Sequence, residues 1–439
     1  YEIRLSLVGS EMCIRDREVE ILTLEDCLRI GIDNNLSLEG KRKEIQRSKY
    51  GVSENRSKLL PQINAIAGYS NNFDPPVSVT DGSSYGVPYN ITQTLQHSAN
   101  AGLEMQMPLF NQTLYTSMSI AKVMEEISRL SYGKAREDVI LQISKMYYLG
   151  QVTAEQIMLI KANITRLEEL RDITQAFFDN GMSMEVDLKR VNINLENLKV
   201  QYDNAQAMMK QQLNMLKYIM DYPAEKEIAL IPVNTDSITT VALTGLSENI
   251  YELQLSQSQV QLAERQKKII TNGYIPSLSL TGSWRYAAYT DKGYHWFHSG
   301  PSNQWFRSYG VGLTLRIPIF DGLDKTYKIK KAMIDIENKR LAWEDARKNL
   351  QTQYLNAVND LMNNQRNFKK QKDNYLLAED VYAVTSDRYR EGIASMTEVL
   401  QDEMQMSEAQ NNYISAHYNY RVTNLMLLKL TGQIESLVK

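Results

Sequence analysis

The chain has 439 residues, enough for two or three ordinary domains, and a formal net charge of −3 at pH 7. Acids and bases are nearly balanced, which excludes the basic footprint of a nucleic-acid-binding protein. Its two cysteines, Cys13 and Cys27, are too few for a disulfide framework or a zinc site. No apolar run reaches the length of about 18 residues that a transmembrane helix needs.

The first 17 residues, YEIRLSLVGSEMCIRDR, match neither a signal peptide nor anything later in the chain. Residues 6–16 look like the translation of a sequencing adapter. We therefore interpret residues 1–17 as a non-native segment and expect the fold to begin at residue 18.

Thr23 opens the first predicted helix, because a threonine N-cap is followed by the acids Glu25 and Asp26 in the first turn. The helix is expected to run to about Leu60, where Pro61 ends it. Asn34-Asn35 is the point at which it could break.

A two-residue alternation follows this helix and recurs about 210 residues later. The apolar face carries Ile63, Ala65, Ala67, Tyr69, Leu103, Met105 and Met107, then Leu278, Leu280, Gly282, Trp284, Tyr309, Val311, Leu313, Leu315 and Ile317. The polar face carries Gln62, Asn64, Gly68, Ser70, Glu104 and Gln106, then Ser277, Ser279, Thr281, Ser283, Ser308, Gly310, Thr314 and Arg316. The pattern predicts four strands with one apolar and one wet face. Polar loops at roughly 71–96 and 286–307 join them in pairs.

Each strand pair is followed by very long helices with apolar residues three and four apart, which is typical of coiled-coil packing. From Asn111 to Phe178 the first would measure about 100 Å at 1.5 Å per residue. Gly181 and Gly392 lie where the helices must reverse, since glycine readily adopts the left-handed turn conformation. Residues 221–246 carry two prolines and lose the pattern, so we interpret them as an equatorial connection.

The first strand, the returning strand and the glycine reversal therefore each occur twice, in the same order. This repetition indicates a duplicated structural unit. Residues 18–220 form the first repeat and residues 247–434 the second. One chain supplies only four strands, and the two open edges of such a sheet would be intolerable in hydrocarbon. The strands are thus expected to close into a barrel with other copies of the chain.

The strands are bounded by Pro61, Pro108, Pro276 and Pro318. Together with the glycine-tipped hairpins and the duplication, they resemble the TolC-like outer-membrane efflux family, over roughly residues 21–433. The resemblance implies an α+β membrane protein, in which long coiled-coil hairpins join a trimeric 12-stranded barrel. It implies a homotrimer in outer-membrane lipid with a helical tunnel in the periplasm. It also implies a periplasmic adaptor (membrane fusion protein), an inner-membrane pump of RND or ABC type, and export of small molecules or, as in type I secretion, of proteins. No cofactor, nucleic acid or metal is expected.

The resemblance implies that the hairpin tips contact the adaptor, through Gly181, Met182, Ser183, Gly392, Ile393 and Ala394. Family tips typically run Val-Gly-Leu or Val-Gly-Thr, whereas asparagine or glutamate precedes the glycine here. The alternative is that the two glycines only permit the turns.

The resemblance also implies a periplasmic gate, formed by Asp187, Tyr389, Glu398, Gln401 and Asp402. Tyr389 is predicted to donate a hydrogen bond to Asp187, and Glu398 to form an acidic ring around the trimer axis. The alternative is that these are ordinary exposed acids on a helix turn.

The four histidines do not indicate a metal or catalytic site. His295 and His298 have a loose metal-like spacing in a predicted surface loop, while His97 and His417 are single residues in a strand and a helix. No catalytic arrangement appears, so an enzyme is not expected. A soluble trimeric coiled-coil scaffold or a periplasmic adaptor without a barrel remains the alternative, although neither explains four paired strands.

Overall fold

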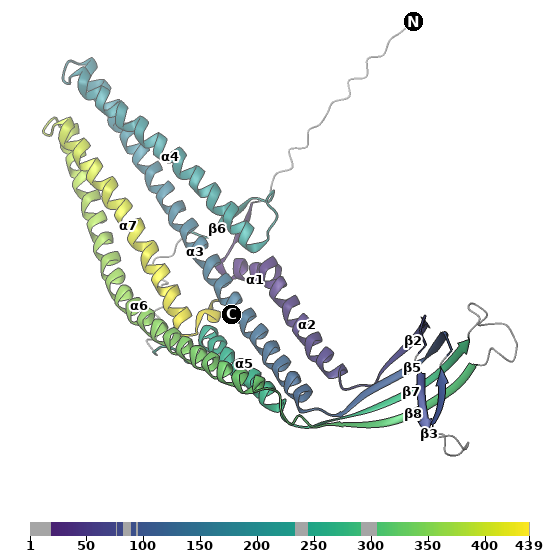
Figure 1. Cartoon of the computed structure of the whole chain (residues 1–439). Coiled ribbons are helices and arrows are strands. Elements are labelled where there is room, and N and C mark those ends of the chain that lie inside the picture. The colour runs from purple at the N-terminus through teal and green to yellow at the C-terminus, as the bar shows by residue number, and fades with distance from the viewer. Residues whose placement is uncertain are drawn as a thin grey trace, which may run out of the picture. The chain divides into compact units, whose positions relative to one another are not determined.

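The computed structural model describes residues 19–75, 77–81, 89–93, 95–232, 245–290 and 305–438. The adapter-like segment 1–17 and the histidine pair at 295 and 298 lie outside the described residues. The helices are α1 (Leu24–Asn34), α2 (Leu36–Ser57), α3 (Gln112–Asp179), α4 (Glu185–Met220), α5 (Tyr251–Asn272), α6 (Asp324–Arg390), α7 (Met396–Leu430) and the 3-10 helix η2 (Ile434–Val438) (Figure 1). The strands are β1 (Glu20–Leu22), β2 (Gln62–Asn71), β3 (Val77–Asp81), β4 (Tyr89–Gln93), β5 (His97–Phe110), β6 (Ile228–Leu230), β7 (Ser277–Thr290) and β8 (Trp305–Arg316).

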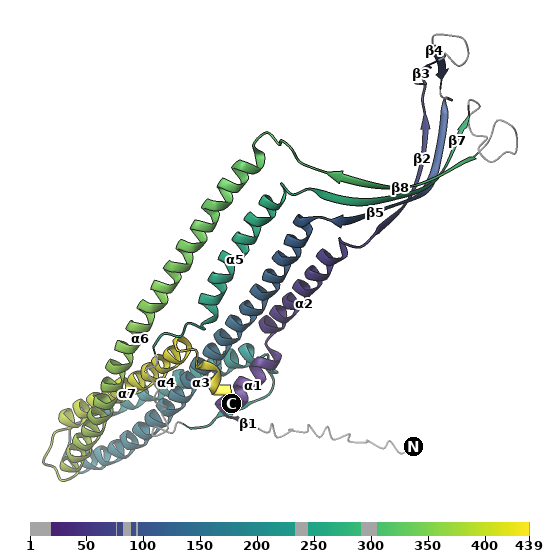
Figure 2. The same cartoon turned by 90° about the horizontal axis from the view of Figure 1, so that it is seen from below.

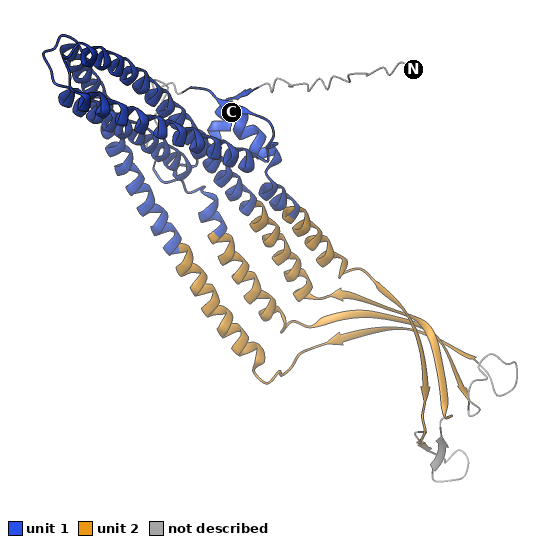
Figure 3. Cartoon of the chain, turned by 90° about the horizontal axis from the view of Figure 1, so that it is seen from above, with its two compact units in different colours: residues 1–43, 130–255, 344–439 blue, residues 44–129, 256–343 orange. Residues whose placement is uncertain are grey.

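The chain divides into two compact units, each of which takes residues from both halves of the sequence (Figure 3). Unit 1 comprises residues 1–43, 130–255 and 344–439 and contains the helix reversals. Unit 2 comprises residues 44–129 and 256–343 and contains the strands β2, β5, β7 and β8.

The first helix begins and breaks where the sequence predicts. The Thr23 hydroxyl accepts a hydrogen bond from the Asp26 backbone N–H at 3.0 Å, and the Asp26 carboxylate accepts from the Thr23 N–H, which forms a capping box. The helix ends at Asn34, and the Asn35 side chain then caps α2 by accepting from the Leu38 N–H at 3.1 Å. The predicted break at Asn34-Asn35 is thus confirmed.

The four predicted strands form one antiparallel sheet in the order β2-β5-β7-β8, which leaves β2 and β8 as its edges. Cross-strand partners share the predicted faces, since Leu280 pairs with Leu313 on the apolar face and Thr281 with Gly312 on the polar face. The polar face encloses a hollow of about 540 Å³, lined chiefly by polar side chains and glycines. Trp284 and Tyr286 pack edge to face on the apolar face, near the middle of β7, with ring centroids 5.6 Å apart.

Both predicted loops are shorter than expected. The antiparallel pair β3–β4 lies within the first, and β7 runs on to Thr290 while β8 begins at Trp305. The prediction was wrong here because the alternation of Tyr286, Ala288 and Thr290 continues the strand among residues whose composition suits a loop.

The long helices also agree with the sequence, since α3 has 68 residues and α6 has 67. Within unit 2, α2, α3, α5 and α6 lie side by side in that order (Figure 2). The contacts that join successive helices are Ser48 to Ser128 at 2.7 Å, Thr116 to Asn272 at 2.6 Å and Glu264 to Arg340 at 2.7 Å. Among the described helices, none combines the length and the apolar character that crossing a membrane requires.

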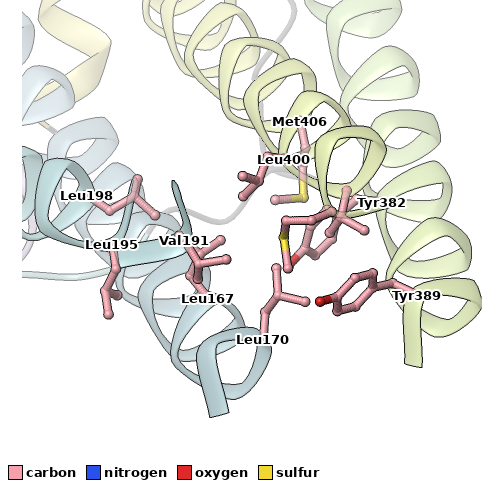
Figure 4. Close-up of a cluster of buried hydrophobic side chains, with 11 residues drawn as sticks. Leu167, Leu170, Val191, Leu195, Leu198, Tyr382, Tyr389, Leu400 and Met406 are labelled. Carbon is pink, nitrogen blue, oxygen red and sulfur yellow. The ribbon is translucent and has the colours of Figure 1, made fainter. Parts of the chain in front are cut away.

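A buried cluster in unit 1 holds the helices near the reversals together (Figure 4). It consists of Leu167, Leu170, Val191, Leu195, Leu198, Tyr382, Tyr389, Met396, Val399, Leu400 and Met406. These residues come from α3, α4, α6 and α7, so the cluster packs the first hairpin (α3–α4) against the second (α6–α7).

The sequence did not reveal a buried carboxyl group on α3. Glu137 is only 4% exposed, and ion pairs lie around it between Asp138 and Lys429 at 2.5 Å and between Arg136 and Glu435 at 2.8 Å. Burial raises the pKa of the Glu137 carboxyl from 4.5 to about 7; Lys429 opposes this shift, whereas Glu435 adds to it.

Glu137→Gln should therefore remove a pH dependence of stability. The folded chain disfavours the ionised carboxylate, so the free energy of unfolding of the wild type should fall as pH rises from about 4.5 to about 7. The loss should be on the order of 3 kcal/mol per copy and stay constant above that range. The glutamine variant should lack this fall and be more stable than the wild type at pH 8.

Denaturant unfolding of the purified protein at pH 5 and pH 8 measures the difference. The control is Glu126→Gln, which changes an exposed glutamate of the same helix. Equal pH dependence in the wild type and Glu137→Gln would show that Glu137 is not the responsible group.

Candidate functional site

The two helix reversals have the same backbone geometry. Gly181 and Gly392 have φ values of +74° and +76°, which confirms the predicted left-handed turns. The Met182 N–H donates to the Phe177 carbonyl at 2.7 Å, and the Gly181 N–H donates to the Phe178 carbonyl at 2.9 Å, a Schellman motif. The bonds Ile393 to Arg388 and Gly392 to Tyr389 repeat the motif at the second tip. A Cβ atom at either glycine would meet open space, so the backbone conformation, not crowding, favours glycine.

The tips expose apolar side chains that no other described part of the chain covers. Met182 is 70% exposed and Ile393 62%, and Met184 and Val186 are also exposed just after the first turn. Ser183 is half-buried, and its hydroxyl donates to the Thr174 carbonyl at 3.3 Å. Ala394, also predicted as a tip contact, is half-buried and packs against the buried cluster. The outward apolar surface of the tips therefore centres on the two methionines, Val186 and Ile393.

The helices that leave the two tips begin differently. Ser395 caps α7, since its hydroxyl accepts from the Glu398 N–H at 3.3 Å and the Glu398 carboxylate accepts from the Ser395 N–H at 2.8 Å. These hydrogen bonds from Ser395 hold the pKa of Glu398 below its usual range, so the exposed carboxylate stays ionised. Met184 starts α4 without a side-chain cap. Asp187, at the position equivalent to Glu398, instead pairs with Arg190 at 3.3 Å.

The predicted hydrogen bond between Tyr389 and Asp187 is not formed. The Tyr389 hydroxyl lies 3.2 Å from Thr174 Oγ1, and its ring packs against Phe177 at 5.7 Å between centroids. Burial raises the pKa of the Tyr389 phenol and the negative charge of Asp187 raises it further, which keeps the phenol protonated. Tyr389 thus links the two hairpins as expected, but through α3 and not through the start of α4.

Two ion pairs between α3 and α6 reinforce this link. Arg166 on α3 pairs with Glu379 on α6 at 3.0 Å, and Arg390 pairs with Glu169 at 3.6 Å. These four side chains help to line a cavity of about 280 Å³ between the hairpins. The remaining predicted gate residues lie on α7, where Gln401 is exposed and Asp402 is half-buried.

A family model described as "Outer membrane efflux protein" matches residues 30–220 and 242–433. The chain belongs to this family. Outer membrane protein TolC of Vibrio cholerae is 21% identical over 399 residues, which cover 87% of this chain and 84% of that protein. The probable efflux pump outer membrane protein TtgC of Pseudomonas putida is 23% identical over 431 residues, which cover 93% and 82%. The crystal structure of CusC shares the fold with a TM-score of 0.78 at 16% identity, over 93% of this chain and 91% of that one.

Membership of the outer membrane efflux family places this chain in the outer membrane, as the resemblance implied. In this efflux protein, sequence reasoning missed Thr174 as the partner of Tyr389. A signal was present, because Thr174 follows Ile160 and Leu167 at steps of seven and so places a hydroxyl in an apolar seam. No comparable spacing in the sequence predicts the ion pairs between the two hairpins.

Proposed function

We propose that the chain is the outer-membrane exit duct of an efflux or secretion system, which passes small molecules or proteins from the pump and periplasmic adaptor to the exterior. The observation that carries the proposal is the four-stranded sheet, which has one polar and one apolar face and two open edges. Such a sheet is stable in lipid only when its edges are paired, and its polar face then encloses a channel. The duplicated units are proposed as residues 18–220 and 247–434, joined by 221–246.

The exposed helix surfaces support a homotrimer with a 12-stranded barrel. On α6, exposed apolar residues recur at multiples of seven: Tyr327, Ile334, Leu341, Leu355, Met362 and Leu376. On α4, Val186, Ile193, Val200, Met208 and Met215 form a second stripe at steps of seven or eight. Neither stripe has a partner within the described chain, and seven-residue spacing suits packing against a further helix. We propose that the α4 stripe packs against the Leu355–Leu376 part of the α6 stripe in a neighbouring copy.

The apolar tips are proposed as the contacts for a periplasmic adaptor, which joins the duct to an inner-membrane pump of RND or ABC type. Met182 and Ile393 are exposed directly after the two glycines, beside Met184 and Val186, with Gly181, Ser183, Gly392 and Ala394 shaping the turns. Solvent-exposed methionine suits a surface that adapts to a partner helix.

Tyr389, Asp187, Glu398, Gln401 and Asp402 are proposed as the periplasmic gate, with Thr174 added as the hydrogen-bond partner of Tyr389. Tyr389→Phe removes a bond of about 1 kcal/mol per copy and should raise the conductance of purified trimers in planar bilayers. Glu398→Gln should lower the cation preference, while its amide can still cap Ser395. Unchanged conductance in the first variant and unchanged selectivity in the second would remove these residues from the gate.

Fractionation tests the function itself. The chain should sediment with the outer membrane and migrate as a trimer that heating converts to monomer. Recovery in the soluble fraction would favour a coiled-coil scaffold or an adaptor instead.

A further inference from the structure

Three charged side chains lie on the polar face of the four-stranded sheet. In the register of the sheet, Glu104 is opposite Ser283, Arg285 is opposite Gly102, and Arg316 is opposite Ser277. All three share the face of Thr281 and Gln106, which the proposed barrel turns toward its lumen. The polar face therefore carries two cations and one anion per copy.

Glu104 and Arg285 neutralise one another. The Arg285 Nη2 donates to the Glu104 Oε1 at 2.5 Å, and both side chains are about half exposed to the hollow. Gly102 permits this arrangement, because a Cβ there would lie 2.3 Å from the Trp284 carbonyl oxygen and 2.8 Å from the Arg285 Cα. The Arg285 Nε is buried and has no hydrogen-bond partner in the described chain, so the charge of Arg285 is satisfied chiefly by Glu104.

Arg316 stands at the end of β8 that leads to α6. It is exposed, and no ion pair joins it to another described residue. The second arginine of the strand, Arg307, lies on the opposite, apolar face, where its guanidinium sits 5.9 Å from the centre of the Tyr309 ring. Among the described residues of the sheet, Arg316 alone thus adds an uncompensated charge to the polar face.

We infer that Arg316 and the Glu104–Arg285 pair form an electrostatic filter on the sheet, which makes this end of the duct favour anionic over cationic solutes. The inference rests on the proposed function, since three copies would bring three Arg316 side chains into one ring. A ring of like charges in a confined pore raises the local concentration of counter-ions. The ring of Arg316 side chains would therefore select solutes by charge at a site separate from the hairpin tips.

Reversal potentials of purified trimers in planar bilayers under a potassium chloride gradient test the filter. Arg316→Gln should lower the chloride-to-potassium permeability ratio by roughly twofold or more. Glu104→Gln should raise the ratio, because it leaves Arg285 unpaired. Arg316→Lys keeps the charge and should preserve the wild-type value.

Arg307→Gln is the matched control, because it changes the same residue type on the other face of the same strand. Its permeability ratio should equal that of the wild type. Normal currents with no shift in Arg316→Gln, or equal shifts in Arg316→Gln and Arg307→Gln, would overturn the filter. Failure of the wild-type protein to form any conducting trimer would instead contradict the proposed function.

Discussion

A chain that carries both Gly181→Trp and Gly392→Trp should assemble in the outer membrane in normal amounts but export nothing. Both glycines have positive φ, so a side chain there costs about 1–2 kcal/mol per site, a cost confined to an exposed turn. No atom lies within 4 Å of either Cβ position, so each indole would project outward beside Met182 and Ile393. Export is measured as resistance to a pump substrate in cells that lack their own duct.

Gly322→Trp provides the matched control for the tip variants. Gly322 also has positive φ, at +67°, and open space around its Cβ position, but it precedes α6 in unit 2. This variant carries the same backbone strain and should export normally. Full export by the double tip variant at normal trimer levels would rule out adaptor docking at the tips.

Leu313→Arg should abolish trimer assembly. Leu313 is 67% exposed on the apolar face of β8, opposite Leu280, where the proposed barrel meets lipid. An arginine at the middle of the membrane costs about 2–4 kcal/mol per site in barrel proteins, and the trimer contains three such sites. The heat-modifiable trimer on gels and the amount of protein in the outer-membrane fraction report the loss.

Thr281→Arg is the counterpart on the polar face. Thr281 pairs with Gly312 and points into the hollow, where water can solvate a guanidinium group. Trimer levels should stay close to those of the wild type. An equal loss in both variants would show that the two faces, or the barrel itself, are assigned wrongly.

Features governed by local rules could be predicted from the sequence. The strand faces follow from two-residue alternation, the break before α2 from Asn35, and the reversals from Gly181 and Gly392. The cap of α7 was equally readable, because Ser395 and Glu398 have the spacing of a capping box.

Contacts between hairpins could not be predicted in the same way. Whether Tyr389 meets Asp187 or Thr174 depends on how far α6 is shifted along α3, and a shift of one helical turn moves a side chain by about 5 Å. Heptad spacing defines which face packs but leaves this shift free. The burial of Glu137 could not be predicted for the same reason. It depends on contacts with distant elements, since Lys429 of α7 and Glu435 of η2 lie near its carboxyl group.

The open edges of the sheet, at β2 and β8, have a genetic consequence. If three copies must pair edge to edge, one defective copy inactivates the whole trimer that contains it. A variant that folds and pairs but cannot transport should therefore act dominantly when it is made beside the wild-type chain. With equal amounts and random mixing, only roughly one ring in eight would be entirely wild type.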